Sequence, residues 1–352
     1  MAKYKVLADR LRASFSKSPP GTRLPTEWEL AETYQISRQT VRKALDMLYQ
    51  DGLIERRQGS GTYLCQQPPK GSRNIAVITS FVDDYIFPVI LHDVQTVFDE
   101  NGYSPLIFAT ENQMHKERQI LQRLLSENIA AVLVEGSKTA LPNPNLDLYA
   151  KLSAQNIPVV FLHSAYTGLS GAICIADDNY GGGYTLTKYL YQKGHHTIAG
   201  IFKSDDIQGH ERFRGYASAL RDRGLDIIDA HCLWYDTDDR VQMIQDKNPA
   251  YLNQFIQTAF PRCTAVICYN DEIAYYLIRQ LLAAGYQIPQ DIAVVSFDNS
   301  YFSDLSEVRI TSLAHRPERI GKIAAQKVVS LLAGKPARPI QAGWELVVKQ
   351  SS

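Results

Sequence analysis

The sequence lacks the features that mark membrane and exported proteins. Among its 352 residues, no apolar run approaches the roughly 18 residues that a transmembrane helix needs. The first residues, MAKYKVLADRLRASF, contain no continuous apolar core and no cleavage-site pattern, so we expect no signal peptide. These absences predict a protein that stays in the cytoplasm.

Cysteine is scarce as well. The five cysteines are odd in number and show no CxxC or CxxxH spacing, the patterns typical of metal sites and disulfide frameworks. Two of them, Cys174 and Cys268, lie within apolar runs, where a thiol behaves as a small hydrophobic side chain. We therefore expect no metal ion, no cofactor and no disulfide.

The net charge is formally zero, but the charges are unevenly distributed. Residues 1–73 contain 13 Lys and Arg against 7 Asp and Glu, whereas the other 279 residues contain 24 against 30. This asymmetry suggests that only the first part binds a polyanion. Residues 66–73, QQPPKGSR, include two prolines, a glycine and no hydrophobic side chain, which predicts a linker. We therefore expect one domain over 1–65 and another over 74–352.

The first domain shows the pattern of three helices and a β-hairpin. Apolar residues at helical spacing predict a helix over 3–15. Thr26 and Glu29 form a capping box that begins a second helix, and Ser37 caps a third over about 38–51. Gly52 ends that helix, and LIERR and GTYL predict two strands joined by the turn QGSG.

The third helix has one apolar and one polar face. We expect its apolar residues to be buried, and these are Val41, Ala44, Leu45 and Leu48. On the outer face, Arg38 and Arg42 suit paired hydrogen bonds to guanine and Gln39 suits adenine, because a helix fits the major groove of DNA. Thr40 and Lys43 suit phosphate contacts, as does Arg57 in the hairpin. A solvated surface would explain each residue singly but not their coincidence.

These residues also carry a family resemblance. LPTEWELAETYQISRQTVRKALDMLYQDGLIERRQGSGTYL closely resembles the winged-helix domain of GntR-type transcription regulators, through SRxTVRxAL followed by GLIxRxxGxGT. The resemblance covers nearly all of residues 1–65 and implies a homodimer bound to double-stranded operator DNA. Together, pattern and resemblance predict these DNA-binding residues: Lys5, Glu27, Arg38, Gln39, Thr40, Arg42, Lys43, Arg57, Gln58, Gly59, Ser60, Gly61 and Thr62.

After the linker, short β-rich runs alternate with amphipathic helices. NIAVI, PLIFAT, AAVLVEG and PVVFLHS predict the strands of one parallel, doubly wound unit. AICIAD, TIAGIFK, CLWY, TAVICYN and AVVSF predict those of a second. The chain closes with the strand RITSLAH, a helix over 317–333 and the strand WELVV.

The predicted fold class is thus multidomain. A winged helix-turn-helix of the α+β class precedes a bilobed α/β domain with two doubly wound parallel sheets. We expect lobe one at about 74–175 and 316–343, and lobe two at about 176–314 and 345–352, because two similar α/β units follow each other and the end of the chain returns.

Polar side chains follow many of these strands. Ligands of open parallel sheets bind beyond the carboxyl ends of the strands. Carboxylate, amide and guanidinium groups suit the vicinal hydroxyls of a sugar, and an aromatic ring suits its apolar face. The predicted sugar-binding residues are Tyr85, Phe87, Glu135, His163, Lys203, Arg212, Asn270, Asp298 and His315. Each residue taken alone is more often a cap or an interlobe contact, but the set favours a ligand cleft.

A second resemblance spans about residues 74–350. GHERFRGY, VICYNDEIAYYLI, IPQDIAVVSFDN and ITSLAHRPERIGKIAA resemble the effector domain of LacI/GalR-type repressors and periplasmic sugar-binding proteins. Matched to that pattern, Arg212, Asn270 and Asp298 fall on sugar-contacting positions, whereas His163 and His315 replace other polar ligands. LacI-type proteins couple their domains through a hinge helix, but QQPPKGSR is a poor helix former. The signal must therefore reach the DNA-binding domains another way.

The two resemblances together imply a sugar-responsive repressor. The combination most resembles the L-arabinose-responsive repressors, and L-arabinose as effector depends on this resemblance alone. Alternatives are a repressor or activator that responds to another pentose, a hexose or a nucleoside, a plain sugar-binding protein and, more distantly, a cytoplasmic sugar-processing enzyme. The acidic pair Asp177 and Asp178 before three glycines lacks a phosphate-binding motif, so close packing explains this stretch better than catalysis does.

Overall fold

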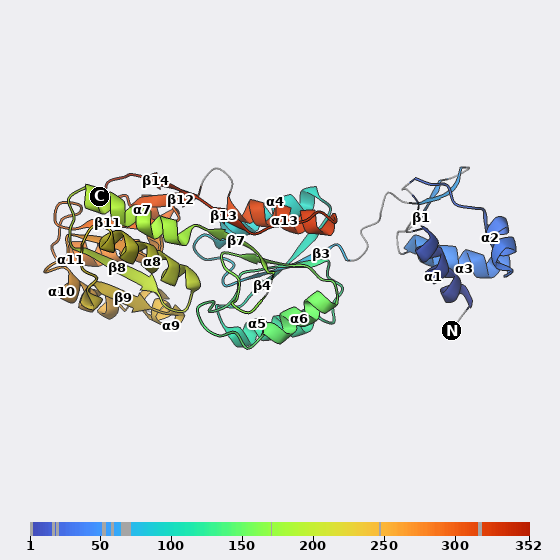
Figure 1. Ribbon diagram of the computed structural model, residues 1–352, viewed down its shortest axis with the longest axis horizontal. Helices are drawn as coiled ribbons and strands as arrows, with labels where there is room; N and C mark the ends of the chain where they lie inside the picture. The colour runs from blue at the N-terminus through green and yellow to red at the C-terminus, as the bar shows by residue number, and fades with distance from the viewer. Residues whose placement is uncertain are drawn as a thin grey trace. The chain divides into compact units, whose positions relative to one another are not determined.

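A computed structural model describes residues 3–15, 18, 21–50, 54–57, 60–64, 72–169, 171–245, 248–315 and 319–352. The chain divides into two compact units, Met1–Ser72 and Arg73–Ser352 (Figure 1). Several predictions lie outside the described residues: the helix stop at Gly52, the tip residues Gln58 and Gly59, the side chain of Arg57 and linker residues 66–71.

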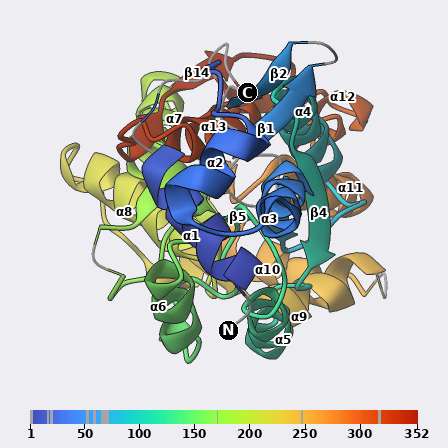
Figure 2. The same cartoon turned by 90° about the vertical axis from the view of Figure 1, so that its right-hand side faces the viewer.

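The described residues of the first unit form three helices and a hairpin (Figure 2). The elements are α1 (Lys3–Phe15), α2 (Glu27–Tyr34), α3 (Arg38–Gln50), β1 (Ile54–Arg57) and β2 (Gly61–Leu64), and the two strands pair antiparallel. The predicted capping box is present: the amide of Glu29 donates to Thr26 Oγ1 at 3.3 Å, and the amide of Thr26 donates to Glu29 Oε2 at 2.6 Å. The predicted cap of α3 is present too, since the Thr40 amide donates to Ser37 Oγ at 3.3 Å.

The core of this unit forms around α3. The four residues predicted to be buried are so: Val41, Ala44, Leu45 and Leu48. They pack against apolar residues of the other elements, namely Leu7, Leu11, Leu24, Leu30, Ile54 and Leu64. Because the helical spacing turns these side chains inward, the intervening polar residues of α3 face outward.

The second unit has two lobes, each built around a wholly or mostly parallel sheet with helices on both faces (Figure 1). The elements of lobe one are β3 (Asn74–Thr79), α4 (Phe87–Glu100), β4 (Ser104–Ala109), α5 (Met114–Leu124), β5 (Ala131–Val134), α6 (Leu146–Ala154), β6 (Val159–Leu162), β7 (Ile173–Asp177), α13 (Ile320–Leu332) and β13 (Ile340–Ala342). Among the described residues the strand order is β13-β7-β6-β5-β3-β4, parallel throughout. One apolar cluster packs α4 and α13 on this sheet, and another packs α5 and α6.

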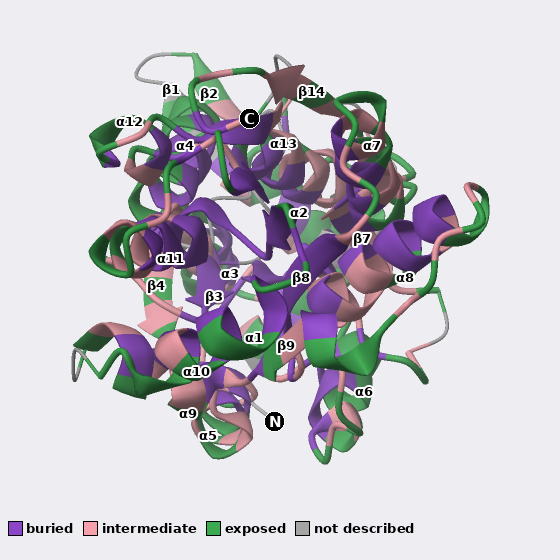
Figure 3. Cartoon of the chain, turned by 90° about the vertical axis from the view of Figure 1, so that its left-hand side faces the viewer, coloured by how far each residue is buried: buried purple, intermediate pink, exposed green. Residues whose placement is uncertain are grey.

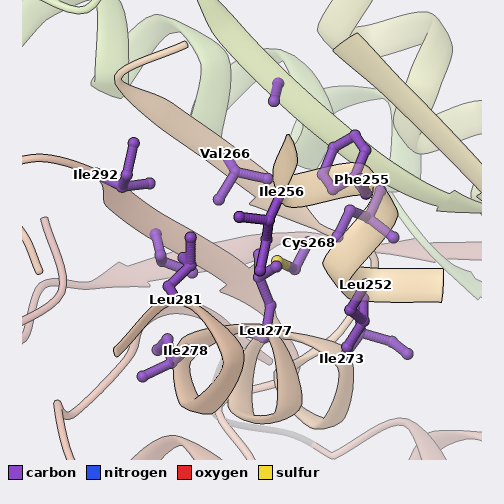
Figure 4. Packing of buried hydrophobic residues seen from close by; sticks show 14 of the residues in the cluster. Leu252, Phe255, Ile256, Val266, Cys268, Ile273, Leu277, Ile278, Leu281 and Ile292 are labelled. Carbon is purple, nitrogen blue, oxygen red and sulfur yellow. The ribbon is translucent and has the colours of Figure 1, made fainter. Parts of the chain in front are cut away.

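Lobe two repeats this arrangement. Its elements are α7 (Asn179–Gln192), β8 (Ile198–Lys203), α8 (Ile207–Arg221), η1 (Asp229–His231), β9 (Cys232–Tyr235), α9 (Thr237–Arg240), η2 (Val241–Gln245), α10 (Ala250–Ala259), β10 (Ala265–Cys268), α11 (Asp271–Ala283), β11 (Ala293–Phe297), α12 (Phe302–Leu305), β12 (Thr311–His315) and β14 (Trp344–Val347). The strand order is β14-β12-β11-β10-β8-β9, and within the described chain only β14 runs antiparallel to its neighbour. Figure 4 shows α10 and α11 packing their apolar side chains against this sheet. The buried strand β8 lies inside the lobe (Figure 3).

One strand lies in a different sheet from the one expected. AICIAD, predicted to begin the second unit, forms β7, which pairs with β6 and β13 in lobe one. Its central Ile175 is fully buried in the lobe-one core. An apolar strand fits the edge of either sheet equally well, so its place depends on contacts that the sequence pattern does not contain. The chain then passes between the lobes after β7, after β12 and again between β13 and β14 (Figure 1).

No helix in the described part of the chain is both long enough and apolar enough to span a membrane.

Candidate functional site: a DNA-binding surface and an interlobe cavity

The outer face of α3 presents the predicted DNA-binding side chains. Arg38, Gln39, Arg42 and Lys43 are exposed, Thr40 is half-buried, and Lys5 on α1 is exposed. The exposed side chains of this set are accessible to a DNA groove and its phosphates, whereas Thr40 Oγ1 lies 2.8 Å from Ser37 Oγ.

Glu27 holds one of these arginines in place. Arg42 donates from Nη2 to Glu27 Oε2 at 2.9 Å and from Nε to Oε1 at 3.1 Å, which joins the first turn of α2 to α3. This hydrogen-bonded arginine lowers the pKa of the Glu27 carboxyl. Arg42 is thereby oriented before any DNA arrives, with its remaining Nη1 donors uncommitted in the described contacts.

The backbone conformation at the hairpin tip explains why a glycine stands at position 61. Gly61 adopts φ +119°, a backbone conformation that residues with a Cβ rarely take. Ser60 Oγ and the Tyr63 hydroxyl lie 2.7 Å apart and so fasten the turn. Ser60 and Gly61 are exposed and Thr62 is half-buried, as a projecting wing requires.

In the second unit, a cavity of about 670 Å³, its open mouth included, lies between the lobes. The lining residues are Ser80, Phe81, Tyr85, Ile86, Phe87, Glu135, His163, Asp177, Lys203, Asp206, Gln208, Arg212, Tyr235, Arg240, Tyr269, Asn270, Glu272 and Asp298. Of the predicted sugar-binding residues, all but His315 are among them. These residues converge because they follow strands at the carboxyl ends of the two sheets. In lobe one, Glu135 follows β5 and His163 follows β6. In lobe two, Asn270 follows β10 and Asp298 follows β11.

The lobe-one wall carries an ion pair. His163 Nδ1 lies 2.8 Å from Glu135 Oε1, and the amide of Ser80 donates to Glu135 Oε2 at 2.9 Å. Burial alone would raise the pKa of the Glu135 carboxyl, but His163 and the Ser80 amide outweigh burial and lower it. Burial would likewise lower the pKa of His163, but Glu135 outweighs it and raises that pKa. Both shifts favour the charged pair.

In the lobe-two wall of the cavity, the buried Lys203 contacts two carboxylates and a hydroxyl. Lys203 Nζ lies 2.9 Å from Asp205 Oδ1 and 2.5 Å from Asp206 Oδ2, and it donates to Thr237 Oγ1 at 3.1 Å. Burial opposes its charge, but the two carboxylates outweigh burial and raise the pKa of the ammonium group.

Arg212 is fixed from every side. Its guanidinium lies 4.7 Å from the centre of the Tyr269 ring and 4.0 Å from that of Phe297. Nε donates to Asn179 Oδ1 at 2.9 Å, and Nη2 lies 3.5 Å from Asp298 Oδ1. Such packing between rings gives the arginine a single orientation in the lining of the cavity.

The lobes also contact each other across the cavity. The Tyr85 hydroxyl of lobe one donates to Asp298 Oδ2 of lobe two at 2.6 Å. Three lining residues with a Cβ adopt positive φ: Tyr85 at 53°, His163 at 65° and Asp298 at 92°. Such backbone strain persists where the surroundings enforce it and gathers at binding sites.

His315 lies behind the cavity rather than in its wall. Its Nδ1 is 3.0 Å from Asp177 Oδ1, in an alignment that makes the contact an ion pair rather than a hydrogen bond. Its ring lies 4.7 Å from that of Trp344. Because Asp177 ends β7 and His315 ends β12, the pair joins the two sheets where the chain crosses between them.

Several lining residues were not predicted. Asp177 was assigned to packing, and Tyr269 adjoins the predicted Asn270 at a strand end, where the same rule would have found it. Arg240 lies in the short helix α9 and Glu272 in the first turn of α11. No sequence pattern distinguishes these two residues from charged residues at the surface. The packing interpretation holds for the neighbouring glycines: a Cβ on Gly183 would come within 2.1 Å of the Arg212 carbonyl oxygen.

Comparisons with known proteins agree with this architecture. Residues 3–64 match the family of bacterial regulatory proteins of the gntR type, and residues 187–352 match the periplasmic binding protein-like domain. The chain is 35% identical over 320 residues to an arabinose metabolism transcriptional repressor of Halalkalibacterium halodurans, covering 89% of this chain and 84% of that one. It is 33% identical over 317 residues to the protein of the same name from Geobacillus stearothermophilus, covering 89% and 86%.

A solved structure shares the fold. The transcription regulator GntR from Chromobacterium violaceum superposes with a TM-score of 0.68 at 23% identity, covering 79% of this chain and 99% of that one.

A DNA-binding winged helix and a bilobed domain with an interlobe cavity define a ligand-responsive transcription regulator. The chain belongs to the family of sugar-responsive transcriptional repressors that join a GntR-type domain to a periplasmic-binding-protein-like domain. Both resemblances noted in the sequence are thereby confirmed.

Proposed function

We propose that this protein is a cytoplasmic homodimer that represses genes of L-arabinose use and leaves its operator when L-arabinose enters the interlobe cavity. The observation that carries the proposal is the cavity itself, lined by paired charges and aromatic rings in a chain that also presents an exposed basic helix. The residues proposed to bind DNA and sugar are those predicted from the sequence, with His315 supporting the wall from behind.

The charges of the cavity favour a neutral ligand. Lys203, Arg212 and Arg240 each lie beside at least one carboxylate, so no cation in the described lining is left to balance a phosphate or an acid sugar. The same carboxylates and cations suit the hydroxyls of an uncharged sugar. Tyr85 and Phe81 offer aromatic surface for its apolar face.

L-arabinose is the first candidate among neutral sugars. The relatives from Halalkalibacterium halodurans and Geobacillus stearothermophilus are named as arabinose metabolism repressors, and each covers most of this chain. Other pentoses, hexoses and nucleosides satisfy the same charge argument and belong in the same experiment.

The mechanism follows from the position of the cavity between two lobes. A sugar that contacts both lobes stabilises their closed arrangement, and it shifts the balance only by its preference for that arrangement. In the dimer, closure changes how the two recognition helices meet successive major grooves. A coupling of about 1–3 kcal/mol would lower operator affinity roughly 5- to 150-fold.

The test is binding of the purified protein to DNA from upstream of its own gene and of neighbouring sugar genes, with and without a panel of sugars at a stated salt concentration. Release by L-arabinose alone is the expected result. Tight binding that no sugar changes would overturn the effector assignment, and an absence of DNA binding would overturn the proposal as a whole. Mass measurement by light scattering tests the dimer.

A further inference from the structure

A second set of contacts joins the two lobes outside the cavity, and we call it the interlobe latch. Its lobe-one residues follow β4 and β5, and its lobe-two residues follow β8 and β9. In chain order they are Asn112, Lys138, Thr139, Ala140, Asp205, Ile207 and Thr237. None of them belongs to the described lining of the cavity. The polar side chains of the latch are buried, apart from that of Lys138, which is half-buried.

Asn112 is the centre of the latch. Its Oδ1 accepts a hydrogen bond from the Lys138 amide at 2.7 Å, within lobe one. Its Nδ2 donates to Thr237 Oγ1 of lobe two at 2.6 Å. The Thr237 hydroxyl in turn donates to Asp205 Oδ2, also at 2.6 Å. Because an amide oxygen only accepts and an amide nitrogen only donates, these partners fix the orientation of the Asn112 side chain.

Two backbone amides also donate from one lobe to the other. The Ile207 amide, at the start of α8, donates to Thr139 Oγ1 at 3.1 Å. The Ala140 amide of lobe one donates to the Asp205 carbonyl oxygen at 3.2 Å. The first bond gives a partner to one of the amides that a helix leaves unpaired at its start. Separation of the lobes breaks both bonds.

The lobe-one half of the latch is held in an unfavourable backbone conformation. Asn112 has φ 54°, Glu111 before it has φ 51°, and Lys138 has φ 46°. Residues with a Cβ rarely adopt positive φ, and such strain persists where the surrounding contacts enforce it. The hydrogen bond from the Lys138 amide to Asn112 joins two of these residues and is one such contact.

The latch contacts two residues of the cavity lining. Lys203 donates to Thr237 Oγ1 at 3.1 Å, and this is the same oxygen to which Asn112 donates. Asp206 Oδ1 accepts from Asn112 Nδ2 at 3.4 Å. Lys203 and Asp206 both line the cavity. The turn after β8, which carries these lining residues, is therefore held against lobe one by groups outside the cavity.

We propose that Asn112 and Thr139 are positioning residues, and that the latch stabilises the closed lobes before any sugar enters the cavity. Protein groups alone make these contacts, so their free energy favours closure whichever sugar binds. The latch then sets how much sugar releases the operator, whereas the lining sets which sugar does so. The effect on release depends on the proposed function, but the latch itself can be tested without sugar.

Hydrogen exchange of the full-length protein without sugar, resolved to single amides by mass spectrometry, is the first test. The amides of Ala140 and Ile207 are bonded across the lobes, whereas that of Lys138 is bonded within lobe one. Thr139→Val keeps the shape of the side chain and removes the acceptor of Ile207. We expect the Ala140 amide to exchange about 2- to 10-fold faster in this variant, although its own acceptor is unchanged. The Lys138 amide should exchange at the wild-type rate.

Two further threonine variants separate the hydrogen bond from packing. Thr139→Ser keeps the hydroxyl and should restore slow exchange of the Ala140 amide. Thr187→Val is the matched control, because Thr187 is buried and its hydroxyl donates to the Gly183 carbonyl oxygen within α7 at 2.8 Å. It should leave the exchange of Ala140 at the wild-type rate.

Asn112→Asp tests the latch from its centre. Aspartate has the size of asparagine and tolerates positive φ, so the backbone conformation can be kept. It replaces the amide donor with a carboxylate beside Asp205 and Asp206, whose oxygens lie 3.4 Å from Asn112 Nδ2. Like charges then oppose closure, and the Ala140 amide should exchange faster than it does in Thr139→Val.

Titration calorimetry with L-arabinose and a panel of other sugars is the second measurement. Thr139→Val should weaken the binding of every sugar by one factor of about 2- to 10-fold, and the ratio of affinities between sugars should not change. A residue that touched the sugar would change that ratio. The L-arabinose concentration that releases half of the operator DNA should rise by the same factor.

Wild-type amides of Ala140 and Ile207 that exchange as fast as those of an unstructured peptide would overturn the latch, and so would equal rates in wild type and Thr139→Val. Unchanged sugar affinity in Thr139→Val, or an altered ratio between sugars, would overturn its role in the response to sugar. Wild-type protein that binds no sugar would overturn the proposed function, and the exchange rates would still decide whether the latch forms.

Discussion

The hydroxyl of Tyr85 donates a 2.6 Å hydrogen bond to Asp298, and this bond connects lobe one to lobe two across the cavity. Both residues have positive φ, 53° and 92°, so each backbone is held in a conformation that is unfavourable in isolation. The bond exists only while the lobes are close together. It therefore contributes to the closed arrangement and not to an open one.

Tyr85→Phe should weaken sugar binding. The variant removes a hydrogen bond to a charged acceptor from the closed arrangement, so we expect about tenfold lower affinity for L-arabinose. Titration calorimetry measures it. Tyr184→Phe is the control, because Tyr184 donates a similar 2.8 Å bond to Asp222 within one lobe. Equal losses in the two variants would contradict a role for Tyr85 in closure.

Arg42→Ala should separate DNA binding from sugar binding. Loss of an arginine contact with a base costs about 1–3 kcal/mol, so operator affinity should fall about 5- to 150-fold. Affinity for L-arabinose should not change, since Arg42 belongs to the other compact unit. Fluorescence anisotropy with operator and random DNA, together with calorimetry, measures both.

Lys43→Ala gives the comparison for a phosphate contact. It should weaken binding to operator and random DNA alike and reduce the salt slope by about 1. If Arg42→Ala also weakened both DNAs equally, Arg42 would not read the operator sequence.

His315→Gln should change how stability depends on pH. Burial opposes the charge on His315, but Asp177 outweighs it and raises the pKa of the imidazole above its unfolded value of about 6.5. The stabilisation is thus complete below pH of about 6.5 and is lost as the pH rises through the raised pKa. The variant should lower Tm by about 2–4 °C at a pH of about 6 and by less at about 9.

His195→Gln is the opposite control for this measurement. Burial, with His196 and Lys193, lowers the pKa of His195, so its neutral form is favoured in the folded state. Any stabilisation that neutral His195 contributes is present at high pH and is lost as the pH falls through the lowered pKa. A His315→Gln deficit that grew with rising pH would show that the ion pair with Asp177 does not form in solution.

Gly183→Ala should damage both stability and the sugar site. The added Cβ would lie 2.1 Å from the backbone oxygen of Arg212, so α7 and α8 must separate. We expect a loss of about 1–3 kcal/mol in the free energy of unfolding by urea. L-arabinose affinity should fall as well, because Arg212 moves with α8. Gly343→Ala, where a Cβ meets nothing within 4 Å, should leave both unchanged.

Much of the fold could be predicted because its signals are local. The capping box at Thr26, the apolar face of α3 and the alternation of strands with helices depend on neighbours within one or two turns of chain. The cavity residues at strand ends were predictable for the same reason, since parallel strands place their carboxyl ends together. This rule alone was enough to predict that His163 and Glu135 belong to the cavity, without knowledge of other tertiary contacts.

What the sequence alone determined is the kind of protein: a basic winged helix and a repeated α/β lobe, set by residue spacing, capping and charge. Only the tertiary structure decided that β7 lies in lobe one, that His315 supports Asp177 from behind, and that Arg240 reaches the cavity. Spacing along the chain records which side chains share a face of one element. It does not record which groups from distant elements meet, because those contacts form only when the sheets and the turns between them pack.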